Sequence, residues 1–224
     1  MKHIILLLSI LFFVMRSFCQ DYKLIDSINQ RLLNEKVQDT NTVYLYLALS
    51  SNYTWSKPDS AIFYGNKGLI LSKLLHFKKG EFLTLTSLSF PLAIVRSDSA
   101  SVSYAYSVIK IAEDEKNKDD LLLADYILGS VYLYIIEYNK ALIPIRRSMD
   151  PEFALMNYAN QHLAQSFLGL NETDSAFYYI HKVLEYNKQH KKINAFDVYL
   201  LGTIYYNKAI YDSALMYYRE ALNI

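Results

Sequence analysis

The sequence predicts an all-α fold built of repeated antiparallel helical hairpins, and three observations support this prediction. The alanines that end a recurring three-residue phrase lie 39, 41, 35 and 38 residues apart, a period typical of stacked hairpins. A small residue precedes each of the last three alanines by 12 positions. With 52% hydrophobic residues, 6 Gly and 4 Pro, the composition indicates a folded, helix-rich chain. The phrase recurs as Asp59-Ser60-Ala61, Asp98-Ser99-Ala100, Asn139-Lys140-Ala141, Asp174-Ser175-Ala176 and Asp212-Ser213-Ala214.

Residues 1–19 predict a secretory signal peptide. Lys2 gives a charged start, the apolar run Ile4–Met15 follows, and Ser17-Phe18-Cys19 precedes a polar segment that begins at Gln20. A run of twelve residues is too short for a membrane-spanning helix, which needs about 20. We therefore expect an exported protein, located in the periplasm or on the extracytoplasmic face of the inner membrane.

Cys19 is the only cysteine in the sequence, and two fates are open for it. We favour plain cleavage after Cys19, because Phe18 and Arg16 depart from the small, apolar pattern of lipoprotein signals. The alternative is a lipid anchor on Cys19 as the mature N-terminal residue. In either case no internal disulfide forms, so the exported domain depends on its hydrophobic core.

Segment 20–37 predicts an N-terminal capping helix that covers the first hairpin. Its apolar residues Ile25, Ile28, Leu32 and Leu33 recur at helical spacing, which predicts an amphipathic helix with these side chains on one face.

Residues 38–224 then predict about five hairpins. The last three have the clearest pattern, in which a small residue on the first helix and an alanine on the second allow the backbones to approach closely. Because the sequence stops at Ile224 inside a second helix, we expect the last hairpin to be truncated. The approximate ranges are 42–78, 79–116, 120–149, 152–191 and 194–224.

Several positions depart from a regular repeat. Leu49 stands where the first unit should have a small residue, and Pro91 lies inside a predicted first helix. The register of Ser99-Ala100-Ser101 is open by one residue. Pro144 predicts a bent or shortened second helix.

The aspartates of the recurring phrase are predicted to cap the second helices. A side-chain carboxylate at a helix start accepts hydrogen bonds from free backbone amides and interacts favourably with the helix dipole. These residues are Asp59, Asp98, Asp174 and Asp212.

The succession Leu201-Gly202, Tyr205, Tyr211-Asp212-Ser213-Ala214, Tyr218 resembles the unit of the tetratricopeptide repeat (TPR) family. The resemblance extends over about Asn41 to Ile224. It implies a right-handed superhelix of antiparallel hairpins, a TPR solenoid, in which the first helices line a concave groove.

The same resemblance implies which residues face a partner. The implied surface is aromatic, rich in hydroxyl groups and nearly uncharged, unlike repeats that bind a terminal carboxylate with lysine and arginine. We expect a protein or peptide partner there. The groove residues are Tyr46, Ser50, Tyr53, Tyr126, Ser130, Tyr134, Gln161, Gln165, Tyr199, Thr203, Tyr206 and Asn207.

No catalytic, metal-binding or cofactor-binding pattern is found in the sequence. The histidines of the mature chain lack the i, i+4 spacing of a helical zinc pair, and we expect them to be scattered surface or groove residues. A glycine-rich phosphate loop and a Gly-x-Ser-x-Gly elbow are absent. The net charge of +1 does not favour nucleic-acid binding. The histidines are His76, His162, His181 and His190.

Three phrases are similar to exported TPR regions that precede a membrane helix and a histidine kinase, or a DNA-binding regulator, in Bacteroidetes bacteria. The phrases are Asp39–Tyr44, Lys57–Ala61 and Leu75–Gly80. The similarity implies a sensor or interaction domain in signal transduction, with any phosphotransfer outside this chain. Contact with a membrane would then come from a segment beyond Ile224 or from a lipidated Cys19. Self-association is left open.

Two other functions also remain open. One is a free periplasmic or surface scaffold that assembles other exported proteins. The other is a glycan-binding module, because sugar rings stack on exposed tyrosine faces.

Overall fold

The computed structural model describes residues 22–34, 38–192 and 194–224, and within these ranges it contains eleven α-helices and no strand. The predicted all-α fold is therefore confirmed. The predicted signal peptide, residues 1–19, lies outside the described residues. No helix within the described ranges is both long and apolar enough to cross a membrane.

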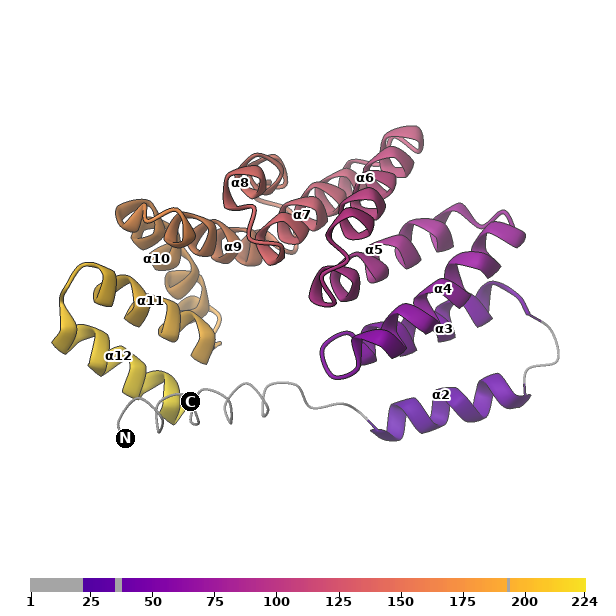
Figure 1. The fold of residues 1–224 in the computed structure, drawn as a ribbon, viewed down its shortest axis with the longest axis horizontal. Coiled ribbons are helices and arrows are strands. Elements are labelled where there is room, and N and C mark those ends of the chain that lie inside the picture. The colour runs from indigo at the N-terminus through magenta and orange to yellow at the C-terminus, as the bar shows by residue number, and fades with distance from the viewer. Residues whose placement is uncertain (1–21, 35–37, 193) are drawn as a thin grey trace. The chain divides into compact units, whose positions relative to one another are not determined.

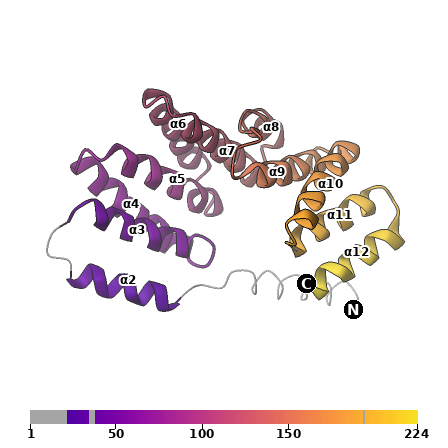
Figure 2. The same ribbon diagram turned by 180° about the vertical axis from the view of Figure 1, so that it is seen from behind.

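The chain divides into two compact units, residues 1–111 and residues 112–224. Figures 1 and 2 show the helices from two sides. The first unit contains α2 (Tyr22–Asn34), α3 (Thr40–Tyr53), α4 (Pro58–Leu74), α5 (Lys78–Ile94) and most of α6 (Asp98–Asp114). The second unit contains α7 (Lys118–Tyr134), α8 (Tyr138–Arg147), α9 (Met156–Gly169), α10 (Thr173–Gln189), α11 (Ala195–Asn207) and α12 (Tyr211–Asn223).

Helices α4 to α8 begin at intervals of 20 residues, at positions 58, 78, 98, 118 and 138. This regularity settles the register of the second repeat. Ser101 is fully buried and its N–H donates to the Ser97 carbonyl, as the N–H of buried Ala61 donates to Lys57. Ala100 is only half-buried. The equivalent of Ala61 is therefore Ser101, which resolves the register that the sequence left open by one residue.

Helix α2 packs on the first hairpin of its unit through Ile25 and Ile28, which are buried against Leu45 and Leu49. Leu32 joins this cluster. Leu33 was predicted on the same face, but it is 78% exposed because it lies one residue beyond the stripe.

Close backbone approach holds the two helices of a hairpin together. A Cβ atom added to Gly129 would lie 2.3 Å from Ile145 Cγ1 and 3.0 Å from the Ile145 nitrogen. Its distance to the carbonyl oxygen of buried Ala141 would be 3.2 Å. A Cβ atom on Gly202 would lie 2.7 Å from a ring carbon of Tyr218. The predicted close contact at the small residues is confirmed for these two hairpins.

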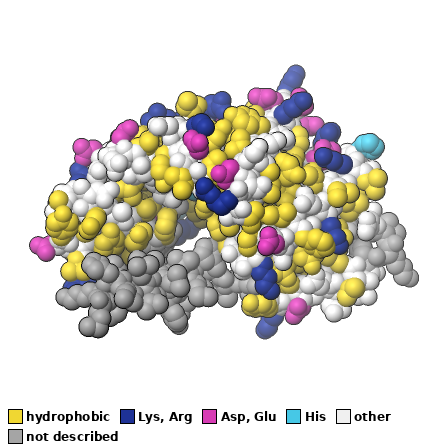
Figure 3. Space-filling view, viewed as in Figure 1, with side chains coloured by type: hydrophobic (Ala, Val, Ile, Leu, Met, Phe, Trp, Pro, Cys, Tyr) yellow, Lys and Arg dark blue, Asp and Glu magenta, His cyan; other side chains and the backbone are white. Residues whose placement is uncertain are grey.

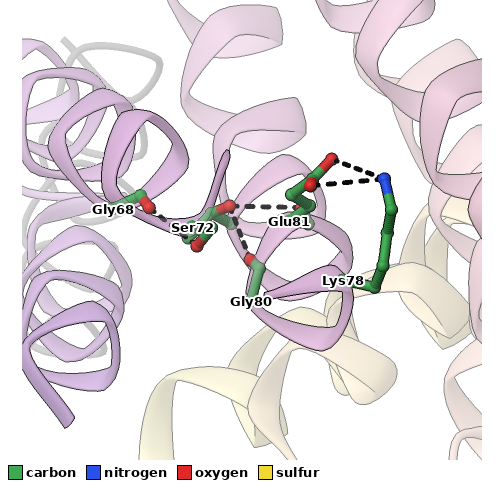
Figure 4. A network of polar contacts seen from close by, with 6 residues as sticks. Gly68, Ser72, Lys78, Gly80 and Glu81 are labelled. Atoms are coloured by element: carbon green, nitrogen blue, oxygen red, sulfur yellow. Dashed lines mark hydrogen bonds and ion pairs between the residues drawn. The ribbon is translucent and has the colours of Figure 1, made fainter. Parts of the chain in front are cut away.

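Small residues have the same role at the junction of α4 and α5. Ser72 donates a hydrogen bond of 2.8 Å to the Gly68 carbonyl, and Lys78 pairs with Glu81 at 3.3 Å in the first turn of α5 (Figure 4). A Cβ atom on Gly80 would lie 2.6 Å from Ser72 Oγ. A larger residue at this position would have to displace the Ser72 hydroxyl and the Phe77 ring, whose Cδ1 would lie 2.4 Å from the added Cβ atom.

The predicted capping role of the aspartates was wrong for three helices. In α4, α10 and α12 the residue before the helix makes no side-chain capping bond, and the aspartate lies inside the first turn. A carboxylate in the first turn is still placed for the other predicted role, a favourable interaction with the helix dipole. These aspartates are Asp59, Asp174 and Asp212, whereas Asp98 is the first residue of α6. Side chains do cap three first helices, through Asp39, Asn117 and Asn194.

The two prolines inside helices have different consequences. Pro144 lies in α8, which has only 10 residues, whereas each of α4 to α7 has 17. This agrees with the shortened helix predicted from Pro144. Pro91 lies near the end of α5, which continues to Ile94.

Among the residues that the structure describes, seven helices are followed by a residue with positive φ, and none of these seven residues is glycine. At the end of α4, for example, the Phe77 N–H donates to the Ser72 carbonyl and the His76 N–H donates to Lys73, the Schellman pattern. A non-glycine residue in this conformation costs about 1–2 kcal/mol. The residues are His76, Arg96, Lys116, Ile136, Asn171, Lys191 and Ala209.

We expect Ile136→Gly to stabilise the protein. Ile136 is β-branched, has φ of 68° and is 61% exposed, so glycine relieves strain and removes little buried surface. The free energy of unfolding in urea should rise by about 0.5–1 kcal/mol. The matched control is Ile143→Gly, at a 65% exposed position inside α8. Because glycine is unfavourable inside a helix, this change should lower the free energy of unfolding by a similar amount. A loss of stability in Ile136→Gly would contradict this account of the helix end.

Candidate functional site

The first helices of the hairpins form a layer in each unit. In the second unit α9 contacts both α7 and α11, and in the first unit α3 contacts α5. Helices α3, α7, α9 and α11 also pack against their own second helices, α4, α8, α10 and α12. A side chain on a first helix therefore packs against its own second helix, lies between two first helices, or remains open to a partner.

The open aromatic surface lies on α11. Tyr199 is 37% exposed and Tyr206 is 56% exposed, and half-buried Thr203 lies between them on the same helix face. Phe196, one turn earlier, is 42% exposed. We call Phe196, Tyr199, Thr203 and Tyr206 the α11 face. Figure 3 shows hydrophobic side chains at the surface in the region of α11.

Contacts between rings hold the α11 face in a defined arrangement. The Phe196 and Tyr199 rings stack with centroids 6.3 Å apart, and Tyr218 of α12 lies 5.5 Å from Tyr199. The Tyr218 hydroxyl donates to Thr203 Oγ1 at 3.4 Å. Sequence reasoning missed Phe196, although its spacing of three residues from Tyr199 is a helical signal.

Four of the predicted groove residues are buried, so they do not offer their side chains to a partner. Neighbouring first helices cover them, and their polar groups bond across that contact or to their own helix. Ser87 Oγ, for example, donates to Ser50 Oγ at 2.8 Å. The four residues are Ser50, Tyr126, Ser130 and Gln161.

The other predicted groove residues are exposed or half-buried. Tyr46 and Tyr53 are half-buried and have Tyr64 as a common stacking neighbour, with centroids 6.4 and 5.8 Å away. Tyr134 is 38% exposed, and its surroundings raise its pKa to about 12 by desolvation. Gln165 is half-buried and Asn207 is exposed. Their role in binding stays a prediction.

His162 lies buried between α7 and α9, so the expectation of a surface or groove histidine was wrong for this residue. Ser130 Oγ donates to the Tyr126 carbonyl at 2.7 Å, which leaves Ser130 Oγ to accept from His162 Nδ1 at 2.8 Å. The imidazole also stacks on the Tyr126 ring, with centroids 5.1 Å apart. Burial lowers the pKa of His162 to about 4 and raises the pKa of Tyr126.

A second buried network connects α9, α10 and α11 at Asp197, which is 1% exposed. Its carboxylate accepts hydrogen bonds from the Gln161 amide and, at 2.8 Å, from the Asn187 amide. Asn157 in turn donates to Asn187 Oδ1 at 3.2 Å. Burial raises the pKa of Asp197, and the two amide bonds oppose that shift. The sequence shows Asp197 only as an acidic residue near a helix start, so the network was missed.

These arrangements suit binding and helix packing. In the described ranges no group of three or more His, Cys, Asp and Glu side chains could hold a metal ion. The imidazole of His162 already uses Nδ1 for Ser130, and amide groups surround Asp197.

Known structures share this fold. The chain is similar to the apo crystal structure of RapI, with a TM-score of 0.66 and 12% identity over 95% of this chain and 94% of that chain. It is also similar to nearly identical TPR-like repeats of a Podosopora anserina kinesin light chain, with a TM-score of 0.62 and 11% identity over 84% of this chain and 96% of that one. The fold is that of a TPR-like solenoid. At this level of identity the similarity concerns the fold alone. No protein-family model and no curated protein sequence matches the chain.

We expect stability to fall with acid because of His162. A histidine whose pKa is lowered by folding contributes stability above its unfolded pKa of 6.5, and this stability is lost as the pH falls to about 4. The shift corresponds to roughly 3 kcal/mol. Urea unfolding of His162→Gln should depend less on pH in this window than unfolding of the wild type.

His181→Gln is the matched control, because His181 is exposed on α10. Burial raises the pKa of Asp197, so this residue adds stability as the pH falls, opposite to the effect of His162. Asp197 is present in both proteins, so the effect of His162 is read from the difference in pH dependence between wild type and His162→Gln. An equal pH dependence in wild type and His162→Gln would refute the assignment.

Proposed function

We propose that this chain is an extracytoplasmic protein-interaction domain of a signal-transduction protein, and that it binds a peptide or protein segment through the α11 face. The observation that carries the proposal is the exposed set of rings on α11, held in place by contacts with Tyr218. The TPR-like fold supports this proposal.

The chemistry of the α11 face suits a segment with apolar or aromatic side chains. Tyrosine rings supply large contact areas at low cost in side-chain entropy, and their hydroxyl groups can bond to a partner backbone. The stacking of Phe196 on Tyr199 reduces the ordering that binding requires. The face itself has no charged residue, so its specificity would come from shape and hydrogen bonding.

The proposed location and output depend on parts of the protein outside the described residues. Residues 1–19 would direct export, with either cleavage after Cys19 or lipidation of it. The bound state would be passed to a membrane-linked output outside this chain. Mass spectrometry of the mature N-terminus distinguishes the two fates of Cys19, and an uncleaved Met1 would contradict export by this signal. A free scaffold would bind partners in the same way but without such an output.

Peptides selected from a random phage-displayed library test the proposed binding face. We expect the selected peptides to bind the wild type, and Tyr199→Ala and Tyr206→Ala to weaken binding roughly tenfold or more in fluorescence anisotropy. Tyr178→Ala is the matched control, since Tyr178 is 55% exposed on the second helix α10. If Tyr199→Ala and Tyr206→Ala bound the selected peptides as tightly as the wild type and Tyr178→Ala do, the α11 face would be ruled out as the binding surface.

The exposed rings also favour a second candidate, a glycan. An array of glycans probed with the wild type and with Tyr199→Ala separates the two. Retention that depends on Tyr199, together with no selected peptide, would support the glycan and contradict the peptide.

A further inference from the structure

Helix α4 carries a row of exposed apolar side chains on the side away from its buried small residues. Phe63, Ile70 and Leu74 are 54%, 68% and 74% exposed. Lys67, which is also exposed, lies on the same face, because residues three and four apart are neighbours on a helix. Its ammonium group lies 4.6 Å from the centre of the Phe63 ring. We call Phe63, Lys67, Ile70 and Leu74 the α4 stripe.

Two other second helices show that this side stays open within the repeat. The positions of Ile70 and Leu74 are also exposed in α6 and α10, and both of these helices are followed by further helices of the chain. Their exposure shows that the next helix of a repeat does not cover this side. In α6 and α10 the two positions carry charged or polar side chains, so the apolar row is special to α4. The equivalent residues, counted from Ala61, Ser101 and Ala176, are Lys110 and Asp114 in α6 and Glu185 and Gln189 in α10.

The segment around the α4 stripe is positively charged. Residues 57–81 include five lysines, one aspartate and one glutamate, a net charge of +3 with His76 neutral. Lys67 and Lys73 lie three residues before and after Ile70, so they flank the apolar row. Two copies of this stripe would bring like charges together, which disfavours self-association through it. The stripe is complementary to a surface that is both apolar and negatively charged. The lysines, all exposed, are Lys57, Lys67, Lys73, Lys78 and Lys79.

We propose that the α4 stripe docks on an anionic lipid membrane, with the axis of α4 parallel to the membrane plane. Phe63, Ile70 and Leu74 enter the boundary between head groups and acyl chains. Lys67 and Lys73 extend to the lipid phosphates, because a lysine can bury its methylene stem beside apolar surface and keep its charge in water. Apolar side chains flanked by lysines are the combination that binds such an interface.

The exposure of the stripe favours a membrane over an acidic protein segment. Ile70 and Leu74 are more than two-thirds exposed, so they protrude from the surface of α4. A protein partner gains most of its binding energy from side chains that fill pockets, whereas a bilayer surrounds a side chain that protrudes. The α4 stripe shares no residue with the α11 face, so failure of peptide binding leaves this proposal standing.

The fluorescence of a single tryptophan tests which part of the protein enters the membrane. Trp55 is the only tryptophan in the sequence, so the variant Trp55→Phe/Phe63→Trp has its only tryptophan on the α4 stripe. Vesicles that contain brominated phosphatidylglycerol should quench this tryptophan. The matched control is Trp55→Phe/Tyr178→Trp, because Tyr178 has the position of Phe63 in α10 and is 55% exposed. Equal quenching of the two proteins, or quenching of neither, would overturn the proposal.

Flotation of the full chain with phosphatidylglycerol vesicles tests the chemistry of the stripe. Ile70→Glu gives α4 the residue that α10 has at this position, and it should weaken binding roughly tenfold or more. Lys67→Gln should weaken binding roughly fivefold. The matched controls are Ile143→Glu on α8 and Lys182→Gln on α10, both at exposed positions outside the stripe. Circular dichroism shows whether each variant is folded.

A wild type that does not float with these vesicles at about 5 mM lipid would overturn the proposal, because even a millimolar dissociation constant binds most of the protein there. Binding at wild-type strength by Ile70→Glu or by Lys67→Gln would also overturn it. Binding of polyglutamate that depends on Lys67, without vesicle binding, would replace the membrane with an acidic polypeptide.

Discussion

The close approach of two helices at a small residue is the constraint on which the α7–α8 and α11–α12 hairpins depend. Gly129 lies against the backbone of α8 near Ile145 and Ala141, and Gly202 lies against Tyr218 near Ala214. A larger residue at either glycine would push the helices apart, because interiors are close-packed and a neighbour fixed by its own helix cannot move freely. The positions of the first helices follow from this contact.

Once the hairpins are formed, the first helices meet one another and must satisfy the polar groups that they bury. The Ser130–His162 pair links α7 to α9, and the amides around Asp197 link α9, α10 and α11. An unpaired polar group at these contacts costs about 1–3 kcal/mol, so the bonds favour one arrangement of the helices. The polar side chains of the first helices are thus largely used for packing, whereas the aromatic α11 face stays open.

The sequence predicted the hairpins well, because a small residue and an alanine at a fixed offset are a local signal of close contact. The pattern was harder to read where another small side chain replaces the alanine: Ser101 is fully buried at the position that Ala61 has in the first hairpin. The sequence failed for the groove, because spacing shows which residues share a helix face but not whether the next helix covers that face. Gln161 and Tyr199 occupy equivalent positions, yet Gln161 is buried against α11 and Tyr199 is exposed.

Gly129→Ala tests the central constraint most directly. In an ordinary helix this change stabilises a protein by about 0.5–1 kcal/mol, since alanine favours the helix over the unfolded chain. Here the added Cβ atom meets Ile145 at 2.3 Å. We therefore predict that urea unfolding will show a loss of about 1–3 kcal/mol. An increase in the free energy of unfolding would contradict the account.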